Sequence, residues 1–163
     1  MIFPTAEKKI ALFIRHAERF NITRMSQAMD PLITEKGRND AFLLGKSLTR
    51  FCPLTLHFSP VQRCRQTAEA IHDGIIAESG SSRVHDFILD LGGPYLRGDW
   101  QIVADLVDKI GQSEFISRWF NNEYPSNMID PLEKAAHTQL AIQADQLENS
   151  ATSTINVTHD WNV

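Results

Sequence analysis

The sequence lacks the features that mark several large classes of protein. Its 163 residues include only two cysteines, Cys52 and Cys64, and these form no CxxC pair or metal-type cluster. No apolar run approaches the roughly 20 residues that cross a membrane, and the N-terminus does not resemble a signal peptide. We therefore expect a cytoplasmic protein with free thiols and no membrane partner, with a single disulfide as the alternative.

An excess of basic charge is also missing. Sixteen Lys and Arg residues stand against 20 Asp and Glu residues, which gives a net charge of -4 and argues against a general nucleic-acid partner. No GxGxxG follows the first apolar run, and the six histidines show no His-Glu-x-x-His spacing, so dinucleotide and zinc chemistry are both disfavoured. The composition, 42% hydrophobic and 22% charged, is that of one globular domain with a sizeable core.

The most informative stretch runs through five apolar residues, Ile10 to Ile14, and ends at Arg15 and His16. Such a run predicts a strand that is buried on both faces. Ligands of open α/β sheets bind beyond the carboxyl ends of the strands, and Arg19 follows one short turn later. Two guanidinium groups beside an imidazole suit phosphate, because arginine donates two hydrogen bonds at once to its oxygens. An Arg-His pair also occurs in ordinary solvated loops, so this motif alone does not assign a site.

Predicted helices and strands alternate along the rest of the chain. We expect strands over 54–59, 84–91 and 153–158, and helices over 35–50, from Val61, over 100–109, over 114–120 and from Asp130 as N-cap. This alternation predicts a three-layer α/β/α sandwich with a mostly parallel central sheet. In the last helix we expect an apolar stripe to face inward, formed by Leu132, Ala136, Leu140, Ala144 and Leu147.

Charged residues follow three of the predicted strands. Arg15 and His16 follow the first, Arg63 lies in the first turn of the helix after the second, and His159 and Asp160 follow the last. A helix N-terminus already favours an anion, and Arg63 adds a full charge there. If the strands are parallel neighbours, these five side chains converge at one edge of the sheet.

Taken in this order, the motifs resemble those of the histidine phosphatase superfamily, the phosphoglycerate mutase-like fold. The residues Arg15-His16-Ala17-Glu18 resemble its Arg-His-Gly motif, and residues 32–38 are similar to its helix entry. The stretch 59–68 resembles its second phosphate-binding segment, and 157–160 resembles the strand that carries its second histidine. The similarity covers nearly the whole chain.

The resemblance implies a metal-independent phosphomonoester hydrolase that needs no cofactor. It makes His16 the nucleophile that becomes phosphohistidine, and it makes Arg15, Arg63 and His159 the ligands of the phosphoryl oxygens. Arg19 fits the acid-phosphatase branch as a further phosphate ligand. Nearby arginines disfavour the imidazolium ion and so keep the imidazole neutral, which is the nucleophilic form.

The proton donor to the leaving group has three candidates. Asp160 fits the acid-phosphatase branch, in which the residue after the second histidine donates the proton. In the other branch a carboxylate from the middle of the chain does so, and Asp90 is the nearest candidate. Glu18 is a third and weaker option.

The sequence departs from the family pattern at its end and at Ala17, which stands in place of glycine. Family members continue past the second histidine with a further helix, whereas only four residues follow His159 here. We therefore expect the C-terminal end to be truncated relative to the family and its bare apolar surface to favour association, a homodimer being one form. Residues 92–129, which are rich in aromatic residues, are expected to form a lid over the site with a small core of their own.

Two other functions remain open from the sequence. A phosphoglycerate mutase-like phosphoryl transferase would use the same intermediate, and a non-catalytic protein could bind a phosphoryl ligand without turnover. The expected substrate is a phosphorylated small molecule or a phosphoprotein, and the sequence does not say which.

Overall fold

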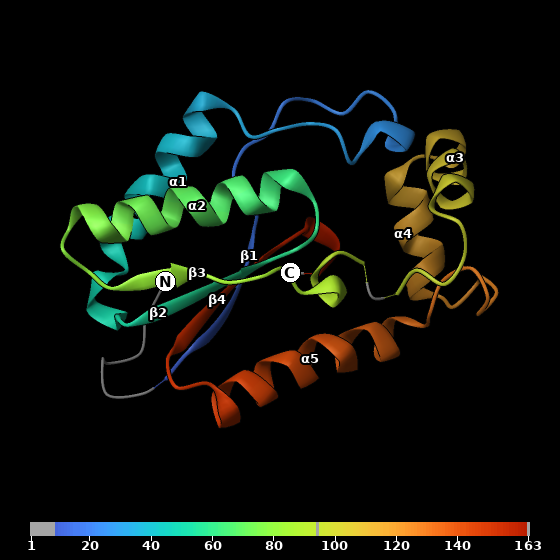
Figure 1. The fold of residues 1–163 in the computed structure, drawn as a ribbon. Coiled ribbons are helices and arrows are strands. Elements are labelled where there is room, and N and C mark those ends of the chain that lie inside the picture. The colour runs from blue at the N-terminus through green and yellow to red at the C-terminus, as the bar shows by residue number, and fades with distance from the viewer. Residues whose placement is uncertain (1–8, 94, 163) are drawn as a thin grey trace.

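The computed structural model describes residues 9–93 and 95–162 and is built around a parallel sheet (Figure 1). Its strands are β1 (Ala11–Arg15), β2 (Leu54–Phe58), β3 (Ser82–Val84) and β4 (Ser153–Thr158), in the order β1-β4-β2-β3. Every pairing is parallel, so the carboxyl ends of all four strands lie at the same edge. No helix of the described residues is long and apolar enough to cross a membrane.

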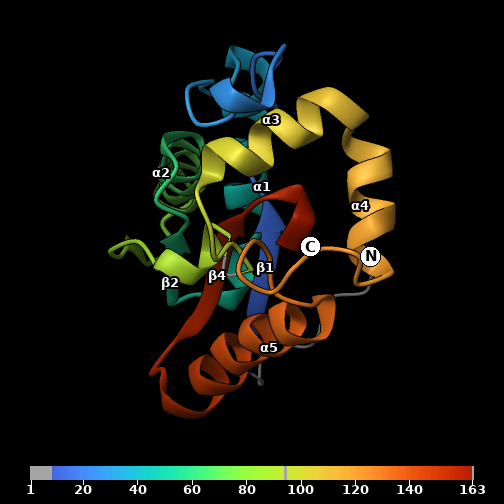
Figure 2. The ribbon, with the colours of Figure 1, turned by 90° about the vertical axis from the view of Figure 1, so that its right-hand side faces the viewer.

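Helices cover both faces of the sheet, which confirms the three-layer α/β/α sandwich (Figure 1). Helices α1 (Glu35–Ser47) and α2 (Gln62–Ala77) lie on one face, and α5 (Leu132–Asn149) lies on the other. Helices α3 (Trp100–Ile110) and α4 (Gln112–Phe120) lie beyond the carboxyl edge (Figure 2). As expected, they have a core of their own, which includes the buried side chains of Tyr95, Val107, Phe115 and Trp119.

The two faces of the sheet differ in chemistry. Alternate residues of β4, Ile155 and Val157, join the apolar core under α1 and α2. Their neighbours Thr154 and Asn156 are equally buried but polar, and they bind Gln146 of α5. Asn156 Nδ2 donates to Gln146 Oε1 at 2.7 Å, Gln146 Nε2 donates back to Asn156 Oδ1 at 2.8 Å, and Thr154 Oγ1 donates to Gln146 Oε1 at 2.6 Å.

This polar face explains why the predicted inward stripe of α5 is wrong beyond Leu132, which packs against the core of α3 and α4. Leu140 and Leu147 are 58% and 44% exposed, and Ala136 and Ala144 are exposed as well. The helix instead turns Gln146 to the sheet, because the buried amide and hydroxyl groups of β4 need hydrogen-bond partners.

Three local predictions are also corrected. The strand after Ile10 is not buried on both faces, since β1 is an edge strand whose residues 11–14 are half-buried, and β4 takes the inner place. Strand β3 ends at Val84 rather than at residue 91, and residues 89–91 form a 3-10 turn. Asp130 does not cap α5, where Pro131 is the N-cap, but pairs with Arg97 and Lys134.

Two glycines let α1 and α2 pack backbone against backbone. A Cβ at Gly45 of α1 would overlap the carbonyl oxygen of Ile71 in α2, and a Cβ at Gly74 of α2 would overlap that of Phe42 in α1. Only glycine allows this approach, which sets the position of α2 and with it the position of Arg63.

Candidate active site

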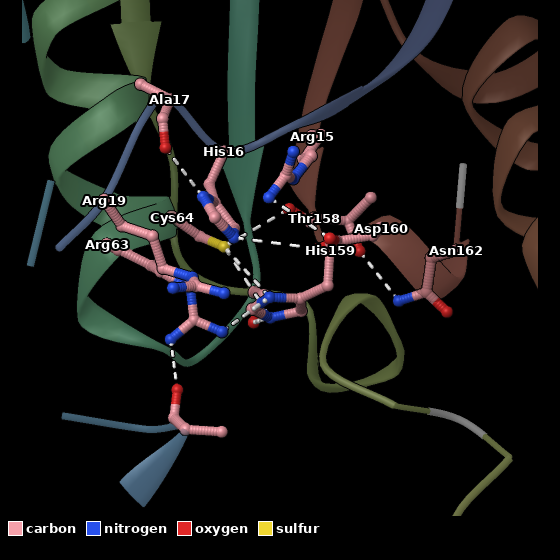
Figure 3. Close-up of polar contacts among 12 residues, drawn as sticks. Arg15, His16, Ala17, Arg19, Arg63, Cys64, Thr158, His159, Asp160 and Asn162 are labelled. Atoms are coloured by element: carbon pink, nitrogen blue, oxygen red, sulfur yellow. Dashed lines mark hydrogen bonds and ion pairs between the residues drawn. The ribbon is translucent and has the colours of Figure 1, made fainter. Parts of the chain in front are cut away.

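The carboxyl edge of the sheet brings together the five side chains that follow the strands (Figure 3). Arg15 ends β1, and the backbone N–H of His16 donates to the Thr158 carbonyl at 2.9 Å, which ties the two strand ends together. Arg63 comes from the first turn of α2. His159 follows β4, and Asp160 begins the final 3-10 turn, Asp160–Asn162.

His16 is a buried, neutral imidazole with one free nitrogen. Its Nδ1–H donates to the Ala17 carbonyl at 2.8 Å, so Nε2 carries the lone pair. In the described part of the chain Nε2 has no hydrogen-bond partner, and it lies 4.0 Å from Asp160 Oδ1. Burial, with the charges of Arg63 and Arg15, lowers the pKa of His16 to about 4 and outweighs the hydrogen bond to Ala17.

His159 stands beside His16, with ring centroids 5.6 Å apart and an angle of 66° between the rings. Arg63 Nη2 donates to His159 Nδ1 at 3.1 Å, so Nε2 bears the hydrogen and donates to Ser59 Oγ at 2.8 Å. Burial, followed by the charge of Arg63, lowers the pKa of His159 to about 3. No role was predicted for Ser59. The only sequence signal for it is that it stands before Pro60, directly after the end of β2.

Unpaired hydrogen-bond donors surround the two histidines. Arg63 donates to the Ala28 carbonyl through Nη1, and Arg19 donates to the Phe20 carbonyl at 2.9 Å, yet the Nε atoms of both arginines are buried without a partner among the described residues. Burial lowers the pKa of both guanidinium groups, but arginine ordinarily titrates so far above neutral pH that both stay charged there. Buried unpaired donors in a native structure call for a ligand, and cationic donors call for an anion.

Of the three candidate proton donors, Asp160 is the one at the site. Its carboxylate pairs with Arg15 at 3.1 Å. Asp90 is exposed and lines a neighbouring groove. Glu18 accepts a hydrogen bond from Thr34 at 2.9 Å and lies near Lys36, at the start of α1.

A pocket of about 90 Å³ opens beside these residues. Arg19, Arg63, His159 and Asp160 form its polar wall, and residues from 92–129 form much of the rest. His16 lies behind this wall with its ring buried, and Ala17 packs against the main core instead of lining the pocket. No group of three or more His, Cys, Asp or Glu residues in 9–93 and 95–162 is placed to hold a metal ion.

Comparison with known proteins agrees with this arrangement. The sequence profile of the histidine phosphatase superfamily (branch 1) matches residues 11–79, which include β1, α1, β2 and α2. The chain has the histidine phosphatase fold. The resemblance seen in the motifs is therefore confirmed over residues 11–79.

Solved structures share this histidine phosphatase fold at low sequence identity. A mycobacterial glucosyl-3-phosphoglycerate phosphatase is 16% identical, with a TM-score of 0.61 over 94% of this chain and 75% of its own. A phosphoserine phosphatase from Entamoeba histolytica is 17% identical, with a TM-score of 0.57 over 92% of this chain and 73% of its own. No curated protein sequence matches the chain.

Proposed function

We propose that the protein is a metal-independent phosphomonoester hydrolase that forms a phosphohistidine on His16. The observation that carries the proposal is the unpaired lone pair of a neutral His16 Nε2, placed among buried arginine N–H groups that also lack partners in the described residues. A neutral imidazole is the nucleophilic form, and fixed cationic donors stabilise the charge that develops on the phosphoryl oxygens.

The geometry suggests the order of bond changes. Nε2 attacks phosphorus while the bond to the leaving oxygen breaks, and the Asp160 carboxyl group gives that oxygen its proton. Water then attacks the phosphohistidine, Asp160 takes the water's proton, and inorganic phosphate leaves with His16 restored. Arg63 and Arg19 hold the equatorial oxygens through both steps.

Substrate binding requires Asp160 to change partners. Its carboxylate now neutralises Arg15 and shields the buried Nε2. A phosphoryl dianion offers Arg15 more charge than a carboxylate does, so it displaces Asp160 from Arg15. That displacement opens the path to His16. The released Asp160 carboxylate takes up a proton from solvent and, as the carboxylic acid, gives it to the leaving oxygen.

The buried position of Nε2 also favours a second candidate, a protein that binds a phosphoryl ligand without turnover. Among the similar structures, the mycobacterial phosphatase has been solved with inorganic phosphate and with VO3, which supports an oxyanion site in this fold. A phosphoryl transferase would share the intermediate, and only the products distinguish it from a hydrolase.

Trapping the intermediate tests the proposal. The protein is incubated with a radiolabelled aryl phosphate, quenched, and assayed for protein-bound label that is stable to base and labile to acid. We expect label in the wild type and in a His137→Ala control, an exposed histidine of α5, but none in His16→Ala. Label that persists in His16→Ala rejects the assignment of the nucleophile.

Replacing the carboxyl group tests the other half of the mechanism. Asp160→Asn is expected to slow turnover by about 10²- to 10⁴-fold, the usual contribution of a general acid. Binding of inorganic phosphate should be kept or tightened, because a competing anion has been removed. Binding of phosphate by the wild type with no turnover of any ester would favour the non-catalytic alternative.

A further inference from the structure

The walls of the pocket away from the histidines are mostly apolar, with Gln112 as a polar exception. Met25, which begins a short 3-10 turn (Met25–Gln27), and Met29, which follows it, line the cavity together with Leu96 and Trp100. A second groove of about 610 Å³ adjoins it and shares Met29, Val61 and Leu96 as lining residues. The pocket and the adjoining groove therefore extend beyond the space that a phosphate needs, and apolar side chains line much of that extension.

The charges along this groove disfavour a second anionic group. Arg97 lines the groove, but its Nε donates to Asp130 Oδ2 at 2.6 Å and its guanidinium pairs with the same buried carboxylate. Asp90, at the same groove, contributes a negative charge. Lys134 shares the Asp130 carboxylate with Arg97, so these three groups and Asp90 together carry no net charge. A carboxylate or second phosphate on the substrate would therefore meet no excess of positive charge, and Asp90 would repel it.

Two uncharged hydrogen-bond donors line the pocket, the side-chain amide of Gln112 and the indole of Trp100. The indole of Trp100 lines the pocket, and its N–H is buried with no partner among the residues that the structure describes. A neutral hydroxyl, ether or carbonyl oxygen would satisfy it.

We propose that the ligand is a phosphomonoester of an uncharged, largely apolar alcohol, with its organic part lying along Met29, Leu96 and Trp100. The inference rests on the proposed function for the phosphoryl end of the site.

Esters with the same type of leaving group test this class. Hexyl phosphate, glycerol phosphate and phosphoglycerate all release alkyl alcohols, so differences in kcat/KM report binding rather than intrinsic reactivity. We expect hexyl phosphate to be preferred by at least about tenfold, with phosphoglycerate the poorest, because even one methylene in an apolar pocket is worth about tenfold or more. A preference for phosphoglycerate in an active enzyme overturns the inference and leaves the proposed function standing.

A binding measurement distinguishes the proposed ligand class from the proposed hydrolase activity. Calorimetry with the His16→Ala variant measures affinity for hexyl phosphate and phosphoglycerate without turnover. Tighter binding of hexyl phosphate, together with no hydrolysis by the wild type, would support the ligand class and reject the phosphatase. Equal or weaker binding of hexyl phosphate would reject the ligand class.

A charge placed on the apolar wall should reverse the preference. Met29 is 46% exposed and lines both cavities, so Met29→Lys should fold and attract a second anion. The ratio of kcat/KM values for hexyl phosphate and phosphoglycerate should fall by about tenfold. Leu140→Lys, on the exposed side of α5, is the matched control and should leave the ratio unchanged. An unchanged ratio in Met29→Lys would contradict the assignment of this wall.

Discussion

The two faces of the sheet are equally well covered but are held by different forces. Under α1 and α2 the contacts are apolar, and the helices meet at Gly45 and Gly74. Under α5 the strand presents threonine and asparagine, and Gln146 satisfies them with hydrogen bonds. The apolar face contributes burial energy, whereas the polar face contributes mainly a fixed register, since a hydrogen bond inside a protein adds little net stability.

Truncating the apolar face should give the largest loss of stability. Ile155 is fully buried in the main core, so Ile155→Ala should lower the free energy of unfolding by about 2–5 kcal/mol. Leu140→Ala, on the exposed side of α5, should change it by less than about 0.5 kcal/mol. Urea denaturation measures both free energies of unfolding. Similar losses in the two variants would contradict the orientation of α5 in which Leu140 faces away from the sheet.

Lowering the pH should destabilise the folded protein through His16 and His159, at the carboxyl edge of the sheet. The pKa values of His16 and His159 lie near 4 and 3 in the folded protein, against 6.5 ordinarily, so the unfolded state binds protons first as the pH falls. Below pH 6.5 the free energy of unfolding should therefore drop by up to about 1.4 kcal/mol per pH unit for each histidine, until the folded pKa is reached.

The double variant His16→Gln, His159→Gln isolates these two groups. Its stability, followed by denaturant titration from pH 7 to 4, should depend less on pH than that of the wild type. His57, whose pKa is also lowered by burial, should leave a residual slope of the same sign. Equal slopes in both proteins would show that the two histidines titrate normally.

Adding a methyl group between α1 and α2 should destabilise the apolar face. Gly-to-Ala changes inside helices normally stabilise them, but Gly74→Ala would press a Cβ into the Phe42 carbonyl. We expect a loss of about 1–3 kcal/mol by denaturation. Ile76→Ala, at a half-exposed position of the same helix, is the control and should cost much less. A stabilised Gly74→Ala would show that the helices are not in backbone contact.

Removing the amide from the polar face should cost less, and the cost should be recoverable. Gln146→Leu leaves Thr154 and Asn156 unsatisfied and should lower stability by about 1–3 kcal/mol. Adding Thr154→Val and Asn156→Leu should return part of it, because no polar group then lacks a partner. Additive losses in the combined variant would show that the network is not coupled.

Much of the fold was predictable because its signals are local. Thr34 caps α1 as its sequence indicates, with its hydroxyl oxygen accepting from the Gly37 N–H at 2.9 Å. The end of β1 was marked by an abrupt change from apolar residues to Arg15, and the end of β4 by the change from a β-branched stretch to His159 and Asp160. The alternation of strands and helices predicted a parallel sheet, in which the carboxyl ends of the strands lie at one edge.

The orientation of α5 and the place of β1 were not predictable in this way. An apolar stripe indicates the inward face only if the partner surface is apolar. Although Thr154 and Asn156 lie only 8 and 10 residues from Gln146 in the chain, it is the tertiary arrangement that turns them toward α5. Likewise, nothing near Ala11 tells that β4 will take the inner position. Among the site residues, the partners of Arg63 and His159, namely Ala28 and Ser59, arise only from tertiary contact.

Arg63 donates a hydrogen bond to the main-chain carbonyl of Ala28, in the loop that contains Met29. This hydrogen bond is made to the main chain, so it does not depend on which side chains the loop carries. Neighbouring residues of the loop can therefore be substituted while the hydrogen bond is kept. A library randomised at residues 25 and 29 is therefore a rational starting point for changing the ester preference of the proposed hydrolase.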